Sequence, residues 1–314
     1  MKGAAILERS PCRRVPETRR FNVSYPSDVA ALPELPEIEH LKRTLEPVLV
    51  GAAVRRVLVH RSDVIHPVQE PSRKSPVSPR DLLKSCTISH LERLGKQLAI
   101  CTEEDRVLCI HLGMSGRLIY RTTPQAREKH THCEWELLNQ RDNVAGILSF
   151  RDPRRFGGIW PFPNRESLLC HRWAELGPDA LTITGPELVA RLAGRDTPIK
   201  AALLNQAILA GVGNIYADEA LFTARIRPNR AAGDLNRTII NTLAKSIRSI
   251  LKHAVQAGGS TIRDYTDSHG NFGTFTSRHR VYGRAGLPCF RCDKPLAHCL
   301  LAQRSTVYCP SCQR

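Results

Sequence analysis

Four cysteines near the C-terminus constrain this chain more than any other feature of its sequence. They form two Cys-x-x-Cys pairs, Cys289 with Cys292 and Cys309 with Cys312, and sixteen residues separate the pairs. Two such pairs at this separation can place four thiolates tetrahedrally around one zinc ion. Metal binding would supply the folding energy that so short a module cannot obtain from its own core. We therefore expect a structural zinc finger over residues 276–314, with no open coordination position for catalysis.

Charge and composition indicate a polyanionic partner. The chain has 314 residues and a net charge of +16, and 41% of its residues are apolar, enough to bury real cores. Such an excess of Lys and Arg suits nucleic acid, because each neutralised phosphate releases a counterion, although a generally basic surface is the alternative. No apolar run is long enough to span a membrane, and no secretory signal is evident. We expect a cytoplasmic, nucleoid-associated monomer without a membrane partner.

The remaining cysteines and the N-terminal segment carry less information. The chain has 11 cysteines, and an odd, scattered set argues against a disulfide framework, so the other seven are expected to be buried apolar residues. Residues 1–32 hold three prolines and little periodicity, which predicts an unstructured extension that the mature protein can lack. A helix then begins with Pro36 in its first turn and ends at Gly51.

The next segment has mostly the pattern of strands. A loop rich in proline interrupts it at residues 68–80. The expected strands are Val54–His60, Gln97–Thr102, Arg106–Leu112, Arg117–Arg121, Cys133–Leu138 and Gly146–Phe150. Short strands in this number favour a sandwich over a parallel sheet, so residues 33–163 are predicted to form an N-terminal β-sandwich domain flanked by helices.

Helical patterns dominate the rest of the chain. After a linker over residues 164–186, helices are expected at about 187–194, 197–209, 215–224 and 235–257. They and a Gly-rich segment, Gly258–Phe275, make up a second domain over residues 187–275. With the finger, the chain is predicted to be an α+β multidomain protein.

Gly211-Val-Gly-Asn214 precedes one of these helices. The glycines permit a tight turn, and Asn214 can cap a helix that begins at Ile215. Free N–H groups at a helix start favour phosphate oxygens, and Lys200 adds a cation nearby. Alone, this pattern is more often just a turn.

Asp152-Pro-Arg-Arg-Phe-Gly157 follows a strand and places two arginines beside a Phe. Such a loop could fill the hole left when a base is extruded from a duplex. The alternative is a turn with a core Phe156. A side chain that fills this hole acts as a wedge. Met114, between flanking glycines, could likewise be a second wedge or a core residue.

Pro33-Glu34 stands just before the first helix. The pair can be read as a Pro-rich lead into that helix. Read chemically, a proline with a free N-terminus is a secondary amine that can attack a sugar anomeric carbon and form an iminium, with the neighbouring Glu as proton donor.

Together these segments resemble the formamidopyrimidine-DNA glycosylase family. The resemblance covers nearly everything from Leu32 to Arg314, and the order and joint presence of the motifs make it specific. The matching segments are Pro33–Glu37, Leu94–Lys96, His111–Gly116, Lys129–His132, Asp152–Gly157, Leu176–Pro178, Gly211–Glu219, Val281–Arg284 and the four-cysteine module with Ala302-Gln-Arg304.

The resemblance implies a β-sandwich, a helix–two-turns–helix domain and a zinc finger around duplex DNA that carries an oxidised purine. It also implies removal of that base and strand cleavage by two eliminations. Pro33 would be the nucleophile and Glu34 the proton donor, and Lys96 and Arg304 would serve the first and second eliminations. Arg304 and Asn214 would bind phosphates, and the side chains of Met114, Arg154 and Phe156 would fill the emptied stack. Further implied DNA contacts are His130, Arg195 and Lys200. The segment Gly258–Phe275 would cover the extruded base.

This chain departs from the family pattern at its start. In the family the proline follows an initiator Met that is removed, whereas here Leu32 and the residues before it precede Pro33. An amide nitrogen is not a nucleophile, so the chain as written should be inactive as a lyase. Our hypothesis is that translation starts at Leu32, from a codon read as Met.

Two other functions stay open. One is an enzyme of the sister endonuclease VIII type, which prefers oxidised pyrimidines, although the Pro-Glu-Leu-Pro-Glu opening and the complete wedge set favour the purine branch. The other is a catalytically silent damaged-DNA-binding protein in which Pro33 stays blocked. The joint presence of Glu34, Lys96 and Arg304 speaks against a loss of catalysis, since a protein that only binds DNA has no evident need of all three.

Overall fold

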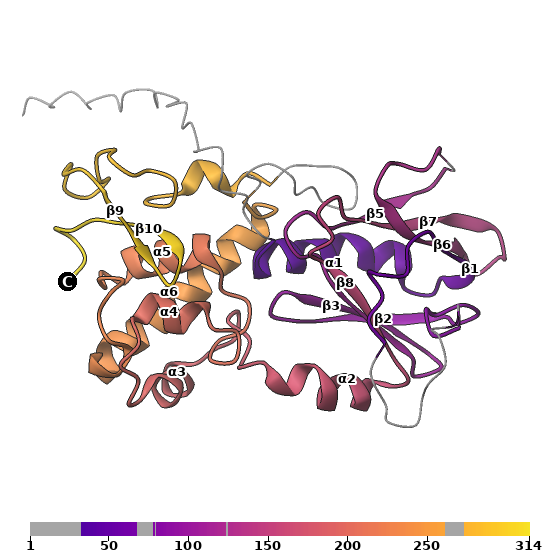
Figure 1. The fold of residues 1–314 in the computed structure, drawn as a ribbon, viewed down its shortest axis with the longest axis horizontal. Helices are drawn as coiled ribbons and strands as arrows, with labels where there is room; N and C mark the ends of the chain where they lie inside the picture. The colour runs from indigo at the N-terminus through magenta and orange to yellow at the C-terminus, as the bar shows by residue number, and fades with distance from the viewer. Residues whose placement is uncertain (1–32, 68–77, 79, 124, 261–272) are drawn as a thin grey trace, which may run out of the picture.

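A computed structural model describes residues 33–67, 78, 80–123, 125–260 and 273–314. Figure 1 shows two bodies side by side along the longest axis of the molecule, a strand-rich domain and a helical domain that carries the C-terminal hairpin. All ten cysteines in these ranges are free, and four of the six that are not predicted zinc ligands are buried. Within the described ranges, no helix is both long and apolar enough to cross a membrane.

Helix α1 (Leu35–Leu49) opens the strand-rich domain. Pro36 fits its first turn, and the Glu37 carboxylate accepts a hydrogen bond from the Glu34 N–H at 2.9 Å, which satisfies one of the free amides at the helix start. The helix ends before Gly51, whose φ of +81° suits glycine. The predicted start and end of this helix are confirmed.

Two four-stranded antiparallel sheets form the β-sandwich, which confirms the predicted fold class. The first has the order β1-β6-β7-β5 and the second the order β2-β3-β4-β8. Side chains from both sheets and from one face of α1 share a single buried core. The strands are β1 (Ala53–Val59), β2 (Ile88–Leu94), β3 (Gln97–Thr102), β4 (Val107–His111), β5 (Arg117–Arg121), β6 (Thr131–Leu138), β7 (Val144–Arg151) and β8 (Gly158–Phe162).

The sequence patterns missed β2 and β8, and both are edge strands of the second sheet. Pro161 lies inside β8, where an edge position tolerates a residue without an N–H. β2 is only half-buried and carries three charged or titratable side chains, which weakens its apolar alternation. The predicted loop at residues 68–80 lies almost wholly outside the described residues.

The segment expected to be a linker contains two short helices, α2 (Arg165–His171) and the 3-10 helix η1 (Trp173–Glu175). Leu168 and Trp173 pack with Cys109 and Phe162 against the outer face of the second sheet. These helices thus cover the sandwich, and the true connection to the next domain is shorter than predicted.

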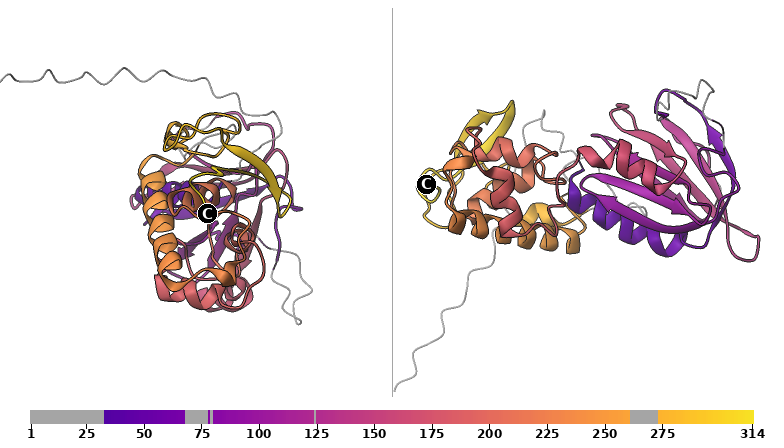
Figure 2. Two further views of the ribbon diagram at one scale, coloured as in Figure 1. Left: turned by 90° about the vertical axis from the view of Figure 1, so that its left-hand side faces the viewer. Right: turned by 90° about the horizontal axis from the view of Figure 1, so that it is seen from below.

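The helical domain contains α3 (Gly185–Leu192), α4 (Ile199–Leu204), α5 (Asn214–Thr223) and α6 (Arg237–Gln256). Leu35 of α1 joins its core, so the two domains share packing at their junction, and the view from below in Figure 2 shows one end of α1 against the helical domain. Helix α4 is shorter than predicted, since it stops at Leu204 and the backbone turns at Asn205. The predicted second, helical domain is therefore present.

The C-terminal hairpin pairs β9 (Ala297–Leu301) with β10 (Arg304–Tyr308). Its core contains Cys289 and Cys309 together with Phe222 of α5, so the hairpin module packs against the helical domain. The predicted finger therefore exists as a packed unit.

Candidate active site

Three chain segments far apart in sequence meet where the two domains join. The start of α1 binds the loop before α5 through a hydrogen bond from the Leu35 N–H to the Gly211 carbonyl, at 3.1 Å. The β2–β3 turn packs on the same loop, since a Cβ added to Gly95 would lie 2.9 Å from the Cβ of Ala210. Gly95 has a φ of +57°, so both backbone conformation and space require glycine next to Lys96.

The Glu34 carboxylate is fixed at the N-terminus of α5. Its two oxygens accept hydrogen bonds from the N–H groups of Gly213 at 2.7 Å and Ile215 at 2.9 Å. A side chain at Gly213 would collide with this carboxylate. Burial raises the pKa of Glu34, although Lys96 and these N–H groups oppose the shift. The carboxyl group therefore holds its proton to a higher pH than an exposed glutamate does.

This arrangement corrects one expectation about the start of α5. The helix begins at Asn214 with Gly213 as its N-cap, rather than at Ile215 with Asn214 as the cap. Two of the N–H groups that were expected to face phosphate are used by Glu34. The side chain of Asn214 instead donates to the Ser305 carbonyl in β10, at 3.0 Å.

Pro33 precedes Glu34 in the chain, and Lys96 lies within electrostatic range of both Glu34 and Arg304. Pro33 is buried, and Lys96 is half-buried at the end of the β2–β3 turn. Burial lowers the pKa of Lys96, the carboxylates of Glu34 and Glu37 oppose that shift, and Arg304 adds to it, so these charges are within electrostatic range of one another. The structure thus brings together the four residues predicted to be catalytic.

Arg304 is exposed at the tip of the C-terminal hairpin. The two residues of the turn, Ala302 and Gln303, have φ values of 48° and 59°, which is the geometry of a tight two-residue hairpin loop. The hairpin is fixed behind Arg304 by the Asn214 side chain and by the Val307 N–H, which donates to Asp218 at 3.0 Å. These hydrogen bonds therefore fix the position of the backbone that carries the Arg304 guanidinium.

Lys200 is placed differently from the expected DNA contact. Its side chain has no exposed surface, and its ammonium group pairs with Asp218 at 2.7 Å. It also donates to the Ser305 carbonyl at 2.9 Å and the Thr306 hydroxyl at 2.8 Å. A direct contact with a phosphate would require Lys200 to leave all three partners, so in this structure it anchors the hairpin that presents Arg304.

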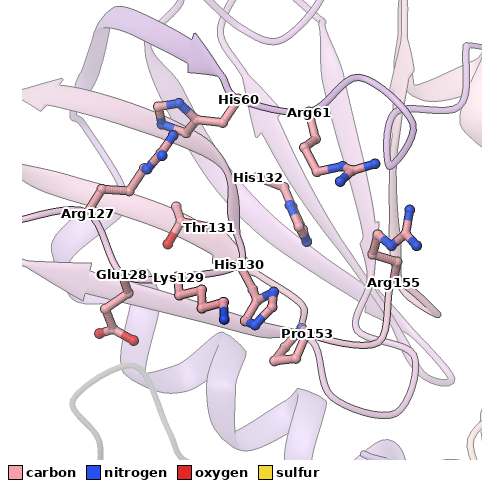
Figure 3. Close-up of a pocket in the computed structure, with 10 residues that line it drawn as sticks. All are labelled: His60, Arg61, Arg127, Glu128, Lys129, His130, Thr131, His132, Pro153 and Arg155. Carbon is pink, nitrogen blue, oxygen red and sulfur yellow. The ribbon is translucent and has the colours of Figure 1, made fainter.

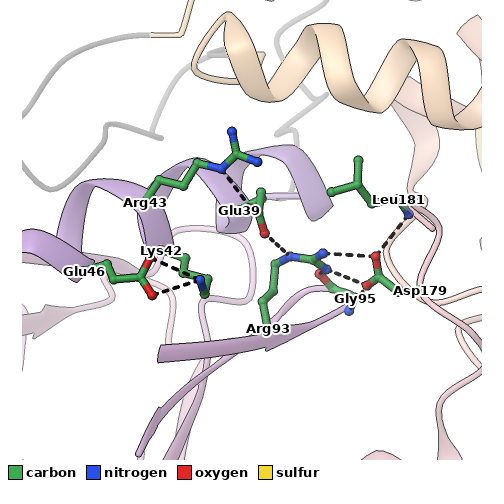
Figure 4. Close-up of polar contacts among 8 residues, drawn as sticks. All are labelled: Glu39, Lys42, Arg43, Glu46, Arg93, Gly95, Asp179 and Leu181. Carbon is green, nitrogen blue, oxygen red and sulfur yellow. Dashed lines mark hydrogen bonds and ion pairs between the residues drawn. The ribbon is translucent and has the colours of Figure 1, made fainter. Parts of the chain in front are cut away.

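An ion-pair network holds the β2–β3 turn in place (Figure 4). The Arg93 guanidinium, whose side chain is 7% exposed, pairs with Glu39 of α1 at 2.8 Å and with Asp179 at 2.6 Å. Asp179 also accepts the Gly95 N–H at 2.9 Å. Sequence reasoning missed both Arg93 and Asp179, although each stands beside a motif residue, three before Lys96 and one after Pro178.

A second buried polar cluster adjoins Glu34. Glu37 accepts hydrogen bonds from the Tyr216 hydroxyl at 2.7 Å and the Ser260 N–H at 2.6 Å. The Ser260 hydroxyl in turn contacts His279 at 2.9 Å. Burial and the nearby charge of Glu34 raise the pKa of Glu37 to about 7. Sequence analysis named Glu37 only as the end of the matching segment Pro33–Glu37, because nothing local shows which residues will surround it.

Met114, Arg154 and Phe156 lie on two loops that touch each other. Asp152 holds both loops, since its carboxylate accepts from the Ser115 hydroxyl at 2.5 Å and from the Gly157 N–H at 2.8 Å. Phe156 is 55% exposed and Met114 is half-buried, and the Arg154 guanidinium lies 4.8 Å from the Phe156 ring centre. Phe156 is therefore not a core residue, which removes the alternative reading of this loop.

His130 and Arg195 stand apart from the cluster around Glu34. His130 is exposed and has a φ of 70°, and its carbonyl accepts the Asp152 N–H at 3.1 Å, so it adjoins the loop of Phe156. Arg195 follows α3 and donates to the Arg191 carbonyl at 2.6 Å. Among the described residues, no hydrogen bond or ion pair connects Arg195 with the other predicted site residues.

The four cysteines of the finger converge on one point. Their sulfur atoms all lie within 4.8 Å of one another. Cys289 and Cys312 are 4.0 Å apart and Cys292 and Cys309 are 3.5 Å apart, whereas a disulfide needs about 2.05 Å. Tetrahedral coordination with metal–sulfur bonds of about 2.3 Å requires sulfur separations of roughly 3.8 Å. The donor set and its spacing therefore fit a tetrahedral metal ion.

Comparisons with known proteins agree with this architecture. The family model of the formamidopyrimidine-DNA glycosylase N-terminal domain matches residues 32–159, and that of the formamidopyrimidine-DNA glycosylase H2TH domain matches residues 176–266. The formamidopyrimidine-DNA glycosylase of Thermomicrobium roseum is 42% identical over 300 residues, which cover 90% of this chain and 99% of the relative.

Solved structures show the same similarity. The MutM (Fpg) protein of Thermus thermophilus has a TM-score of 0.75 at 36% identity, covering 90% of this chain and 98% of that protein. The Fpg of Lactococcus lactis matches over 90% of this chain and all of its own length. In complex with DNA containing N7-benzyl-Fapy-dG it has a TM-score of 0.77 at 31% identity, and with abasic-site DNA 0.78 at 30%. The chain therefore belongs to the formamidopyrimidine-DNA glycosylase family.

Proposed function

We propose that this protein is a base-excision repair enzyme that removes oxidised purines, such as 8-oxoguanine and formamidopyrimidines, from duplex DNA and then cleaves the strand at the emptied site. Membership of the family supports this function. The observation that carries it is the buried Pro33–Glu34 pair, which lies beside Lys96 at the junction of the domains, with the Glu34 carboxylate held by two N–H groups of α5.

Pro33 is the proposed nucleophile once the residues before it have been removed. Its secondary amine would attack the sugar carbon that bears the damaged base, the bond to the base would break, and the ring would open to an iminium. A tertiary amide nitrogen has no available lone pair for this step, so Leu32 must be absent. The match of the family model begins at residue 32, which fits a working N-terminus at Pro33.

Glu34 is the proposed proton donor to the sugar ring oxygen. Because burial raises its pKa, a protonated carboxyl is available at a higher pH than for an exposed glutamate. The two amides of α5 fix its position, so the proton is delivered from a defined point next to Pro33.

Lys96 and Arg304 are proposed to serve the two eliminations that follow. The iminium acidifies the neighbouring sugar proton, and a lysine whose pKa is lowered by burial has more of its neutral, proton-accepting form at a given pH than an exposed one. Arg304 is exposed and cationic at the hairpin tip, where with Asn214 it would bind the phosphates on either side of the extruded nucleotide. Lys200 would act on DNA only indirectly, by holding the hairpin.

Met114, Arg154 and Phe156 are the proposed wedge that fills the emptied stack, and the exposure of Arg154 and Phe156 and the partial exposure of Met114 make them available for it. His130 and Arg195 are proposed as backbone contacts, since both are exposed and basic. Residues 258–275 are proposed to cover the extruded base, but 261–272 lie outside the described residues. Zinc is the metal that best suits four thiolates, and its place in the finger would be structural. We expect the protein to act as a monomer at the nucleoid.

The test is single-turnover excision on duplexes that are matched except for the lesion. Protein that begins at Pro33 should release 8-oxoguanine faster than an oxidised pyrimidine, and Glu34→Gln should lose most of that activity. Faster release of the pyrimidine would favour the endonuclease VIII type. Tight binding of damaged duplex without any base release would favour the silent binding protein.

A further inference from the structure

A second group of metal-binding side chains lies at the edge of the second sheet, outside the finger and the cluster around Glu34. His90 and Glu92 come from β2 and Cys101 from β3, and one donor atom of each lies within 4.8 Å of the other two. Among the residues that the structure describes, only the finger cysteines form another group of three or more such donors. An imidazole, a carboxylate and a thiol therefore converge at one place on this sheet.

Histidines elsewhere in the same domain do not converge in this way. Figure 3 shows a pocket beside the first sheet that is lined by three of them, His60, His130 and His132. Within the described part of the chain, these rings belong to no group of three donor atoms as close as 4.8 Å. The number of histidines alone thus does not produce the arrangement on the second sheet.

The register of β2 and β3 explains why the three side chains meet. His90 pairs directly with Cys101 across the two antiparallel strands, and Glu92 is two positions farther along β2, so it points to the same face. This is the outer face of the sheet, because Cys101 belongs to the small core that contains Leu168 of α2 and Trp173 of η1. The donors therefore stand on paired strands, which hold them more precisely than loops would.

The hydrogen bonds of His90 suit a metal ligand. Its Nε2 lies 2.9 Å from a Glu92 oxygen, and its Nδ1 lies 3.0 Å from the Ser89 hydroxyl. A histidine that binds a metal through one ring nitrogen usually donates a hydrogen bond from the other, which fixes its tautomer. A metal ion would take the place of the proton between Nε2 and Glu92, while the Ser89 hydroxyl accepts from Nδ1.

Arg165 competes for the same carboxylate. Its guanidinium, at the start of α2, donates to both oxygens of Glu92, at 2.6 Å and 3.0 Å. The Arg165 side chain is 49% exposed, and an exposed ion pair contributes little net free energy. A divalent cation can therefore displace Arg165, which would exchange a contact between α2 and the sheet for a link between β2 and β3.

We propose that His90, Glu92 and Cys101 bind a divalent transition-metal ion, with zinc as the best match, and that water fills the fourth position. Zinc accepts nitrogen, oxygen and sulfur ligands in one tetrahedral shell, with bonds of about 2.0–2.3 Å. Cys101 would release its proton to solvent and bind as the thiolate, so that two anionic ligands balance the charge of the ion. Bound zinc would fasten β2, an edge strand, to its neighbour. The site is independent of the proposed function, since none of its residues belongs to the candidate active site.

The experiment counts zinc per chain after equilibrium dialysis of the full chain against buffered zinc. The site variant is His90→Gln with Cys101→Ser, and the matched control is Cys170→Ser with His171→Gln, which removes an exposed thiol and an exposed imidazole from α2. The parent and the control should each bind one zinc ion more than the site variant. His90→Gln alone changes only an exposed side chain and should lose the same ion, so the result does not depend on how well the Cys101 substitution folds.

Cobalt tests whether the thiolate is a ligand. It binds a given set of donors more weakly than zinc does, so the finger keeps its zinc while cobalt fills the second site. A thiolate-to-cobalt absorption band should appear in the parent and in the control, and it should be absent from Cys101→Ser.

Arg165→Gln tests the competition for Glu92. It should tighten zinc binding by roughly twofold to tenfold, because it removes both a partner of the carboxylate and a nearby positive charge. Weaker zinc binding in this variant would contradict the proposed exchange.

Three results would overturn the proposed site. The first is an equal zinc count in the parent and the site variant. The second is loss of the ion from the control, which would place it on Cys170 and His171. The third is a cobalt-loaded parent without a thiolate band.

Discussion

Replacing Arg93 with Met tests whether the network around the β2–β3 turn stabilises the junction of the two domains. The substitution keeps most of the side-chain volume but removes the charge, so Glu39 and Asp179 are left in a nearly buried site without their common cation; each is 13% exposed. Removing one partner from a buried, hydrogen-bonded ion pair typically costs about 3–5 kcal/mol.

The protein provides its own control for this prediction, because Glu39 also pairs with Arg43 at 2.9 Å. The Arg43 side chain is 55% exposed, and exposed pairs four residues apart on a helix contribute only about 0.3–0.5 kcal/mol. The same substitution, Arg→Met, at two partners of one carboxylate should thus differ roughly tenfold in its effect on the free energy of unfolding.

The assay is thermal and urea unfolding of the parent, Arg93→Met and Arg43→Met. At about 2–4 °C per kcal/mol, Arg93→Met should lower Tm by roughly 6–20 °C, and Arg43→Met by no more than about 2 °C. Relative to the parent, the folded Arg93→Met protein should lose more of its strand-cleavage rate than of its base-release rate. Without Arg93 to position it, Asp179 no longer fixes the Gly95 N–H next to Lys96. If both variants lose less than about 1 kcal/mol, Arg93 does not hold the domains together and our account of the turn is wrong.

Three other predictions concern the site itself. Phe156→Ala should cost within roughly 1 kcal/mol of stability, since the ring is 55% exposed, yet should slow excision more on paired than on locally unpaired lesions; a large fall in Tm with equal rate losses would contradict the wedge. Because the raised pKa of Glu34 keeps its carboxyl protonated above the ordinary value of 4.5, excision should decline as pH rises through that pKa, and an excision rate that climbs steadily with pH would refute its role as proton donor. Cys309→Ser should lose bound metal and weaken DNA binding, as Arg304 would lose its support; one metal per chain with unchanged affinity would exclude the finger as a metal site.

Features with a local cause were predictable from the sequence. Pro36 and Gly51 fix the ends of α1 through backbone conformation alone, and the spacing of Cys289, Cys292, Cys309 and Cys312 limits what the C-terminal module can be. The sandwich followed from the number and shortness of the strands. In each case the residue types by themselves determine the outcome.

Features that depend on distant partners were not predictable. The amides at the start of α5 were expected to face phosphate, but Glu34, nearly 180 positions earlier in the chain, takes two of them. Lys200 was expected to contact DNA, and only the fold places Asp218 and the β10 backbone around it. Strand β8 was missed because Pro161 disfavours a strand except at an edge, and edge position is a property of the assembled sheet.

The most direct test of the central claim is borohydride trapping of the enzyme on DNA that carries an 8-oxoguanine. Reduction would convert the iminium between Pro33 and the opened sugar into a stable covalent bond. Protein whose first residue is Pro33 should be trapped, while intact protein that begins at Met1, verified by mass, should bind the same duplex and remain untrapped. Equal trapping of the intact long form would contradict the role of the free Pro33 amine, and with it the mechanism proposed here.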